Sequence, residues 1–192
     1  QNPTVTYSTP GWKTVTLTAS NDQGTTTAIL EQLVLVSDGV EIQGALSESF
    51  PNAASSTNWP ADNVDSDNCF WQWSDLAGHN DMGCMRLNAY DSYFPLDWND
   101  NGDNAIDELA SPSMDLDFLN AQGLSFWYAY ASRSTDVNLL TETLKIYSSI
   151  DCGKTWTVRS TLEFPELITG GVQGAGYVPA PSEWTQHTAN LP

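Results

Sequence analysis

Residues 97–108 carry side-chain oxygens at a spacing that fits a calcium ion. The segment matches the pattern D-x-[DN]-x-[DN]-G-x5-E. Calcium takes about six to eight hard oxygen ligands, and closely spaced Asp and Asn around a glycine turn can wrap such ligands onto one ion. We therefore predict a calcium-binding loop, with a solvated turn rich in Asp and Asn as the alternative. The candidate ligands are Asp97, Asn99, Asn101, Asp103 and Glu108.

The elements around this loop are predicted strands, so it does not belong to a helix-loop-helix EF-hand. Pro95 precedes the loop, and a strand that opens with Leu109 follows it. No apolar stripe at i, i+3, i+4 and i+7 survives along the chain, which disfavours helices. The sequence therefore predicts an oxygen-rich loop that is not flanked by the two helices of an EF-hand.

Residues that could carry catalysis are few. The histidines are His79, in a Gly-His-Asn-Asp loop, and His187, in a predicted strand. The chain has neither the His-Glu-x-x-His zinc motif nor the Gly-x-Ser-x-Gly elbow of serine hydrolases. Carboxylates are so abundant that a glycosidase pair among them cannot be told from background. We predict that this segment is not an enzyme.

Several runs alternate apolar and small or polar residues with the period of two that is typical of strands. Leu124, Phe126, Tyr128 and Tyr130 alternate with a second face that includes Trp127. A similar run over 144–149 is followed by a turn at 151–154 and a strand over 155–161, which predicts a hairpin. A second pair of strands is expected at 70–74 and 84–88. The fold class is therefore all-β.

Three stretches together resemble a known β-sandwich module. They are Asp107–Leu116, Leu124–Ala131 and Leu144–Trp156. This run is similar to the jelly roll related to MAM domains, of the cleaved-adhesin or choice-of-anchor type. Such modules follow the catalytic part of secreted bacterial pappalysin-like metalloproteases and also occur in adhesins. The resemblance covers the chain from about Ser49 onward and implies a jelly-roll β-sandwich.

The first 37 residues resemble a different module. Tyr7–Gly11 and Val15–Asn21 are similar to the C-terminal part of a polycystic-kidney-disease (PKD) repeat, an immunoglobulin-like sandwich. Thr14 to Ala19 predict a strand with one threonine face, 21–24 a turn, and Leu33–Val36 a separate last short strand. We therefore expect 1–38 to be an immunoglobulin-like β-sandwich fragment and 39–192 a MAM-like jelly roll lacking its last strands. Both sandwiches are expected to be incomplete at the chain ends.

The resemblance implies a second calcium loop. Asp62, Asp65 and Asp67 stand where cleaved-adhesin modules have an acidic loop that often holds calcium, with plain turn aspartates as the alternative. The cysteines predict one disulfide and one leftover thiol in an exported protein. Two pairings stay open: Cys69 with Cys84, and Cys84 with Cys152.

The charge of the chain limits its partners. The 192 residues hold 24 acidic against six basic side chains, a net charge of −18, which repels nucleic acid phosphates. No run of about 18 apolar residues predicts a membrane span. The chain does not begin with Met and shows no leader, so we expect a mature or internal fragment. Secretion or cell-surface attachment fits this composition.

Eight tryptophans raise the question of an exposed aromatic platform. Trp71, Trp73 and Trp127 either fill a core between two sheets or stack on sugar rings. We predict a non-catalytic extracellular accessory or adhesion segment, calcium-stabilised, that contacts an extracellular protein or glycan and the remainder of its parent polypeptide. The alternatives are an accessory domain that positions substrate for a secreted zinc metalloprotease, and a carbohydrate-binding module.

Overall fold

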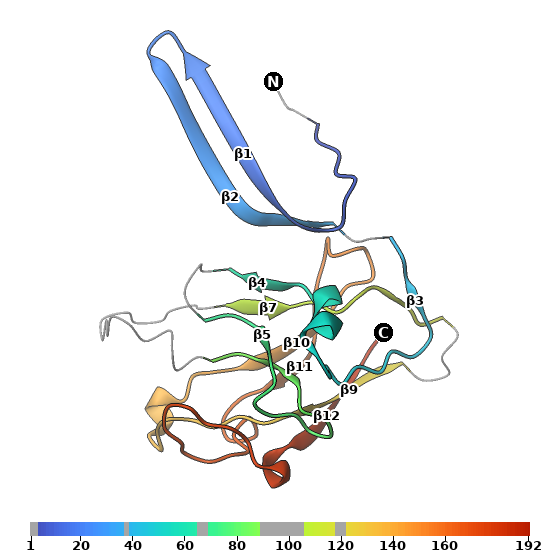
Figure 1. The fold of residues 1–192 in the computed structure, drawn as a ribbon, viewed down its shortest axis with the longest axis vertical. Coiled ribbons are helices and arrows are strands. Elements are labelled where there is room, and N and C mark those ends of the chain that lie inside the picture. The colour runs from blue at the N-terminus through green and yellow to red at the C-terminus, as the bar shows by residue number, and fades with distance from the viewer. Residues whose placement is uncertain (1–3, 37–38, 65–68, 89–105, 118–121) are drawn as a thin grey trace. The chain divides into compact units, whose positions relative to one another are not determined.

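The protein is all-β, as the sequence predicts. The computed structural model describes residues 4–36, 39–64, 69–88, 106–117 and 122–192 (Figure 1). Strands account for 40% of the structure and helices for 7%. The helices are short 3-10 turns: η1 (Ala53–Asn58), η2 (Val137–Leu139) and η3 (Pro181–Glu183). Among the described residues, none of these helices has the length and apolar character needed to cross a membrane.

Two compact units share the chain in alternating pieces. The first unit comprises Gln1–Leu46, Ser56–Gln72 and Arg86–Asp115. The second unit comprises Ser47–Ser55, Trp73–Met85 and Leu116–Pro192. The predicted boundary between 1–38 and 39–192, and the assignment of the pieces to an immunoglobulin-like sandwich and a jelly roll, stay predictions.

A long antiparallel ribbon lies in the first unit. β1 (Gly11–Asn21) pairs with β2 (Gly24–Val36), and Asn21 Oδ1 accepts a hydrogen bond of 2.8 Å from the Gln23 amide in the predicted turn (Figure 1). The prediction that Leu33–Val36 forms a separate strand is wrong, because β2 continues without a break to Val36. A β-bulge between Lys13 and Val15 shifts the register and lets the same two strands keep pairing.

The remaining strands of the first unit are short. β3 (Ile42–Gln43) pairs in parallel with β8 (Met114–Asp115), and β4 (Ala61–Asn63) pairs antiparallel with β7 (Asp107–Leu109). The indole of Trp71 is bonded to the β4–β7 pair, because its Nε1 donates to the carbonyl oxygen of Asp107 at 3.2 Å. A buried indole N–H needs such a partner, so Trp71 is a half-buried structural residue.

Trp73 is held in the same way within the second unit. β5 (Gln72–Ser74) and β6 (Cys84–Arg86) form the predicted two-stranded pair. Trp73 Nε1 donates to the Phe50 carbonyl oxygen at 2.9 Å. Gly83 is buried beside this contact, and a Cβ atom there would collide with the Phe50 carbonyl oxygen. The absence of a side chain at Gly83 therefore lets the backbone of Phe50 approach β6.

Two antiparallel strand pairs form the core of the second unit. β9 (Gly123–Tyr128) pairs with β12 (Thr185–Asn190), and β10 (Leu144–Ser148) pairs with β11 (Thr157–Leu162) (Figure 1). A hydrogen bond of 2.8 Å between Ser160 Oγ and His187 Nε2 links β11 with β12. The buried apolar side chains of the second unit are Ile146, Leu162, Leu167 and Ala189.

The turn between β10 and β11 is stabilised by its own polar side chains. Asp151 accepts hydrogen bonds from the Thr155 amide and from the Thr155 hydroxyl, at 2.9 and 2.6 Å. Ser149 Oγ donates to Asp151 at 2.8 Å and accepts from the Gly153 amide at 2.8 Å. The bonds from Thr155, followed by that from Ser149, lower the pKa of Asp151 to about 2.

None of the three cysteines is in a disulfide in the structure, so neither predicted pairing is formed. Cys69 is buried, Cys84 is half-buried in β6, and Cys152 is exposed. Cys152 occupies a left-handed position in the β10–β11 turn, with φ of 59°. Cys84 lies on the β5–β6 pair and Cys152 in the β10–β11 turn, so the two cysteines belong to different strand pairs.

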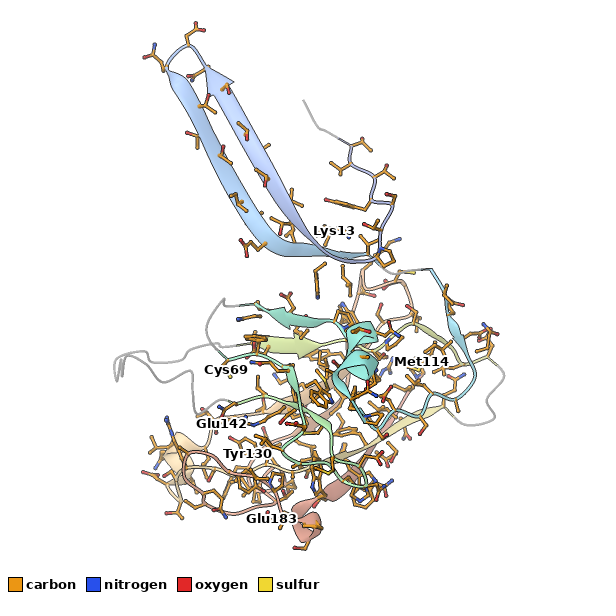
Figure 2. All side chains as sticks on the ribbon, in the orientation of Figure 1. Lys13, Cys69, Met114, Tyr130, Glu142 and Glu183 are labelled. Atoms are coloured by element: carbon orange, nitrogen blue, oxygen red, sulfur yellow. The ribbon has the colours of Figure 1, made fainter. Side chains whose placement is uncertain are left out.

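The long segment between β11 and β12 is anchored to the end of β9. Both Thr169 and Gly170 donate their amides to the Tyr130 carbonyl oxygen at 2.9 Å. The Tyr130 ring lies beside Glu142 (Figure 2), and burial followed by this carboxylate raises the pKa of the phenol. Because Gly170 is buried against Tyr177, a Cβ there would collide with the phenol oxygen. The Gly- and Pro-rich loop over 170–181 is thus held at Gly170 and at Tyr177.

Candidate functional site

The outward face of β9 and β12 carries one exposed tryptophan among uncharged polar side chains. Exposure alternates along β9, as the sequence predicts, so Trp127 points to the surface while Phe126 and Tyr128 point inward. The register places each outward residue of β9 opposite an outward residue of β12. We call this set the Trp127 face; its members are Gly123, Ser125, Trp127, Gln186, Thr188 and Asn190.

His79 orients the indole of Trp127. The two rings stack with their centroids 3.7 Å apart and their planes 11° from parallel. Trp184 meets the same imidazole edge-on at 6.4 Å. Even with this support, 42% of Trp127 is exposed, so the indole keeps a surface for a ligand.

The loop before β6 brings His79 to the tryptophan. Gly78 precedes the histidine, and a Cβ at Gly78 would lie against the carbonyl oxygens of Asp81 and Gly83. The loop can therefore close this tightly only around a glycine. This loop places His79 beside Trp127, which lies 48 residues later in the chain. The sequence marks His79 only as one of two histidines.

The polar groups next to Trp127 suit a hydroxylated ligand. Gln186 Nε2 donates to Ser125 Oγ at 2.7 Å, which fixes the side-chain amide on this face. Thr188 and Asn190 are exposed in the same row of β12. Amides and hydroxyls both donate and accept hydrogen bonds. An aromatic ring beside them adds a flat apolar surface. Since no member of the Trp127 face is charged, its chemistry favours a neutral polyhydroxyl compound such as a sugar.

The structure brings together two of the eight predicted calcium ligands. Asp62 on β4 lies directly opposite Glu108 on β7 in the antiparallel register. Burial raises the pKa of Asp62. Each of these residues comes from a different predicted calcium loop, so the pairing joins the two loops at one place. The other candidates fall outside the described residues: Asp65, Asp67, Asp97, Asn99, Asn101 and Asp103.

Two carboxylates alone do not make a calcium site, which needs about six to eight oxygens. Within the ranges that the structure describes, no group of three or more His, Cys, Asp or Glu side chains is arranged to hold a metal ion. The calcium assignment therefore stays a prediction about loops whose ends, at Asp62 and Glu108, adjoin each other.

The second histidine lies in a different setting. His187 is half-buried, bonded to Ser160 and in edge contact with Phe126 at 5.5 Å. The Ser160–His187 bond joins strands of the two pairs in the second unit, which gives both polar groups a partner inside the fold. A structural role accounts for every contact of this serine and histidine.

Of the three tryptophans that the sequence singles out, only Trp127 is exposed in the structure. Trp71 and Trp73 donate their indole N–H groups to backbone carbonyls, as structural residues do. The sequence misses Gln186 and its neighbours on β12, because their pairing with β9 joins segments about 60 residues apart and no local pattern reveals it. The alternation of small and polar residues in β12 is the signal that marks its outward row.

Compared with known proteins, the chain matches no family model, no curated protein and no solved structure.

Proposed function

We propose that this chain is a non-catalytic, extracellular binding segment of a larger secreted or cell-surface protein, which attaches that protein to a glycan or to a glycan-bearing partner. The observation that carries the proposal is the Trp127 face. It combines an exposed indole, held in place by His79, with a row of uncharged hydrogen-bonding side chains. This is the composition expected for a surface that binds sugar rings.

The charge of the chain supports an extracellular setting. A net charge of −18 keeps a protein soluble and repels nucleic acid phosphates. The Trp127 face is uncharged on this acidic chain, so a neutral ligand approaches it without a repulsive charge in the face itself. The resemblance to adhesin modules points the same way.

A carbohydrate-binding module is the specific form of this function that the Trp127 face favours. Stacking of a sugar ring on the open part of the indole would supply affinity. Hydrogen bonds from Gln186 and Thr188 to the sugar hydroxyl groups would make binding depend on the orientation of those groups. The accessory role beside a secreted zinc metalloprotease rests on the resemblance of the strand pattern alone. In that role the same face would hold a glycosylated substrate.

Calcium is part of the proposal as a stabilising ion. The two predicted loops adjoin each other through Asp62 and Glu108, and a cation between these carboxylates would relieve the repulsion of two like charges across a strand pair. The ion would stiffen the loops rather than take part in chemistry.

Affinity electrophoresis through gels that contain neutral polysaccharides tests the binding function. We expect retardation of the wild-type protein by at least one neutral polysaccharide, and loss of that retardation in Trp127→Ala. Trp156→Ala is the matched control, because Trp156 is also an exposed tryptophan but lies on the β10–β11 hairpin. Equal retardation of Trp127→Ala and wild type by every polysaccharide would contradict the proposal, and so would release of reducing sugar from the polymer.

A further inference from the structure

Positive charge is concentrated in one hairpin of this acidic chain. The hairpin from Leu144 to Leu162 contains three basic residues and one acidic residue, so it carries a formal charge of +2. The rest of the chain then holds 23 acidic against three basic residues, a charge of −20. Half of all the basic residues therefore lie in 19 of 192 positions. The three are Lys145, Lys154 and Arg159.

These three cations form no ion pair with any carboxylate of the described residues, although acidic side chains outnumber basic ones fourfold in the chain. Lys145 and Lys154 are exposed. Arg159 is half-buried, and its Nε donates to Ser148 Oγ at 2.7 Å. This bond uses one of the five guanidinium N–H groups and fixes the plane of the group. Cations that are left unpaired on so acidic a protein are suited to an anion from outside.

The same hairpin presents large apolar side chains to solvent. Tyr147 on β10 and Val158 on β11 are cross-strand partners, and they are 46% and 49% exposed. Trp156 is 57% exposed and Ile150 is 85% exposed. Single exposed apolar residues are common on protein surfaces, but two exposed aromatic side chains on a hairpin with basic side chains are the composition of a binding surface.

The turn holds this surface in a fixed shape. Asp151 and Ser149 satisfy the amides of Thr155 and Gly153 within the turn. Trp156 lies near the turn, with its Cζ2 atom 3.5 Å from the position that a Cβ on Gly153 would occupy. More than half of the Trp156 side chain remains open. A preorganised surface loses less conformational freedom on binding.

We propose that the β10–β11 hairpin binds an acidic oligosaccharide built of uronic acid units. The sugar rings stack on Trp156 and Tyr147, and the ring carboxylates pair with Lys145 and Lys154. This inference rests on the proposed glycan-binding function and adds a second surface of different charge preference to the neutral Trp127 face.

Two other occupants fit the observations less well. A second copy of this chain would bring −18 of like charge to the interface, which opposes association. An acidic peptide would pair with the cations, but nothing in its chemistry requires two exposed aromatic rings. A uronate chain uses both the charges and the rings, so it accounts for the whole composition of the hairpin.

Calorimetric titration of the purified chain with a tetragalacturonate tests the inference, in a buffer without added calcium so that calcium does not cross-link the sugar. The methyl ester of the same tetrasaccharide is the neutral control ligand. We expect binding of the acid and at least about tenfold weaker binding of the ester, since each charge-assisted hydrogen bond contributes about a factor of ten. Added salt should weaken binding of the acid.

Four variants locate the site. Lys145→Gln, Lys154→Gln and Trp156→Ala should each weaken tetragalacturonate binding by about tenfold. Lys13→Gln removes the same charge from the β1–β2 ribbon and should bind like wild type. Circular dichroism confirms that each variant is folded, and a variant that fails this check is replaced by Tyr147→Ala.

Several results would overturn the inference. Equal affinity for acid and ester, equal loss in Lys13→Gln, or equal binding of a hexaglutamate peptide would show that the hairpin does not recognise a uronate. Dimerisation of wild type that Lys154→Gln abolishes would assign the hairpin to self-association. If Trp127→Ala alone abolishes tetragalacturonate binding, the hairpin inference fails while the proposed glycan-binding function stands.

Discussion

The stack of His79 on Trp127 predicts a measurable energetic coupling between the two residues. The rings lie 3.7 Å apart at 11°, and aromatic pairs in such geometries contribute about 0.5–1.5 kcal/mol beyond the area they bury. A double-mutant cycle isolates this contribution from the rest of each side chain's contacts. The variants are His79→Ala, Trp127→Ala and the two combined. We expect a coupling free energy near 1 kcal/mol.

The cost of the single tryptophan variant follows from its exposure. Trp127 is 42% exposed, so somewhat more than half of the side chain is buried. Burial of about 58% of roughly 250 Å² at about 25 cal/mol per Å² gives an upper bound of about 3.6 kcal/mol. His79→Ala alone should cost about 1 to 2 kcal/mol, because it loses the stack and the edge contact with Trp184.

Chemical denaturation followed by far-ultraviolet circular dichroism gives the four free energies of unfolding, without relying on the fluorescence of the mutated residue. The matched control is the same cycle between His79 and Trp156, which share no ring contact. That control cycle should be additive within about 0.3–0.5 kcal/mol. A coupling below about 0.3 kcal/mol for His79 and Trp127 would show that the stack does not hold the indole, and the candidate site would lose its positioning residue.

Three further predictions concern the stability of the fold. Gly83→Ala should destabilise the protein by about 1–3 kcal/mol, because the new Cβ meets the Phe50 carbonyl in a packed interior. Gly174→Ala, which has open space around the new Cβ, should be nearly neutral, and similar denaturation midpoints for the two variants would contradict this packing. Because the pKa of Asp151 is lowered to about 2 from its ordinary 3.8, its stabilising effect is fully present above pH 3.8 and is lost as the pH falls toward 2. Melting of wild type and Asp151→Asn should therefore converge at about pH 2 or below, and a constant difference between them down to that pH would refute the turn assignment. Calcium at about 100 times its Kd should stabilise the fold by about 2.7 kcal/mol, which raises the melting temperature by roughly 5–10 °C. An unchanged melting temperature with and without chelator would show that Asp62 and Glu108 do not bind calcium.

Local alternation explains why much of the fold can be predicted from the sequence. The strands at 123–128 and 144–148 bury alternate side chains, and the period of two is visible in the residues themselves. The β1–β2 turn is likewise set by a local polar cluster around Asn21. These features depend on neighbours within a few positions, so the sequence contains all the information they need.

The parts that the sequence does not reveal depend on distant contacts. The outward row of β12 becomes a binding face only because β12 pairs with β9, and His79 joins that face only because Gly78 lets its loop close. The continuation of β2 to Val36 depends on a bulge in the opposite strand. The charge of the β10–β11 hairpin is visible in the sequence, but the absence of ion pairs with the carboxylates that the structure describes appears only in three dimensions.

The indole resonance of Trp127 tests the central claim most directly. The eight tryptophans give eight indole N–H signals in a nitrogen-edited NMR spectrum, and Trp127→Phe identifies the signal of interest. Titration with the neutral oligosaccharide that corresponds to the retarding polysaccharide should shift the Trp127 signal in a saturable way. The signals of Trp71 and Trp73, whose indoles are bonded to backbone carbonyls, should stay in place. A saturable shift at Trp71 or Trp73 with none at Trp127 would contradict the assignment of the outward face of β9 and β12 as the binding site.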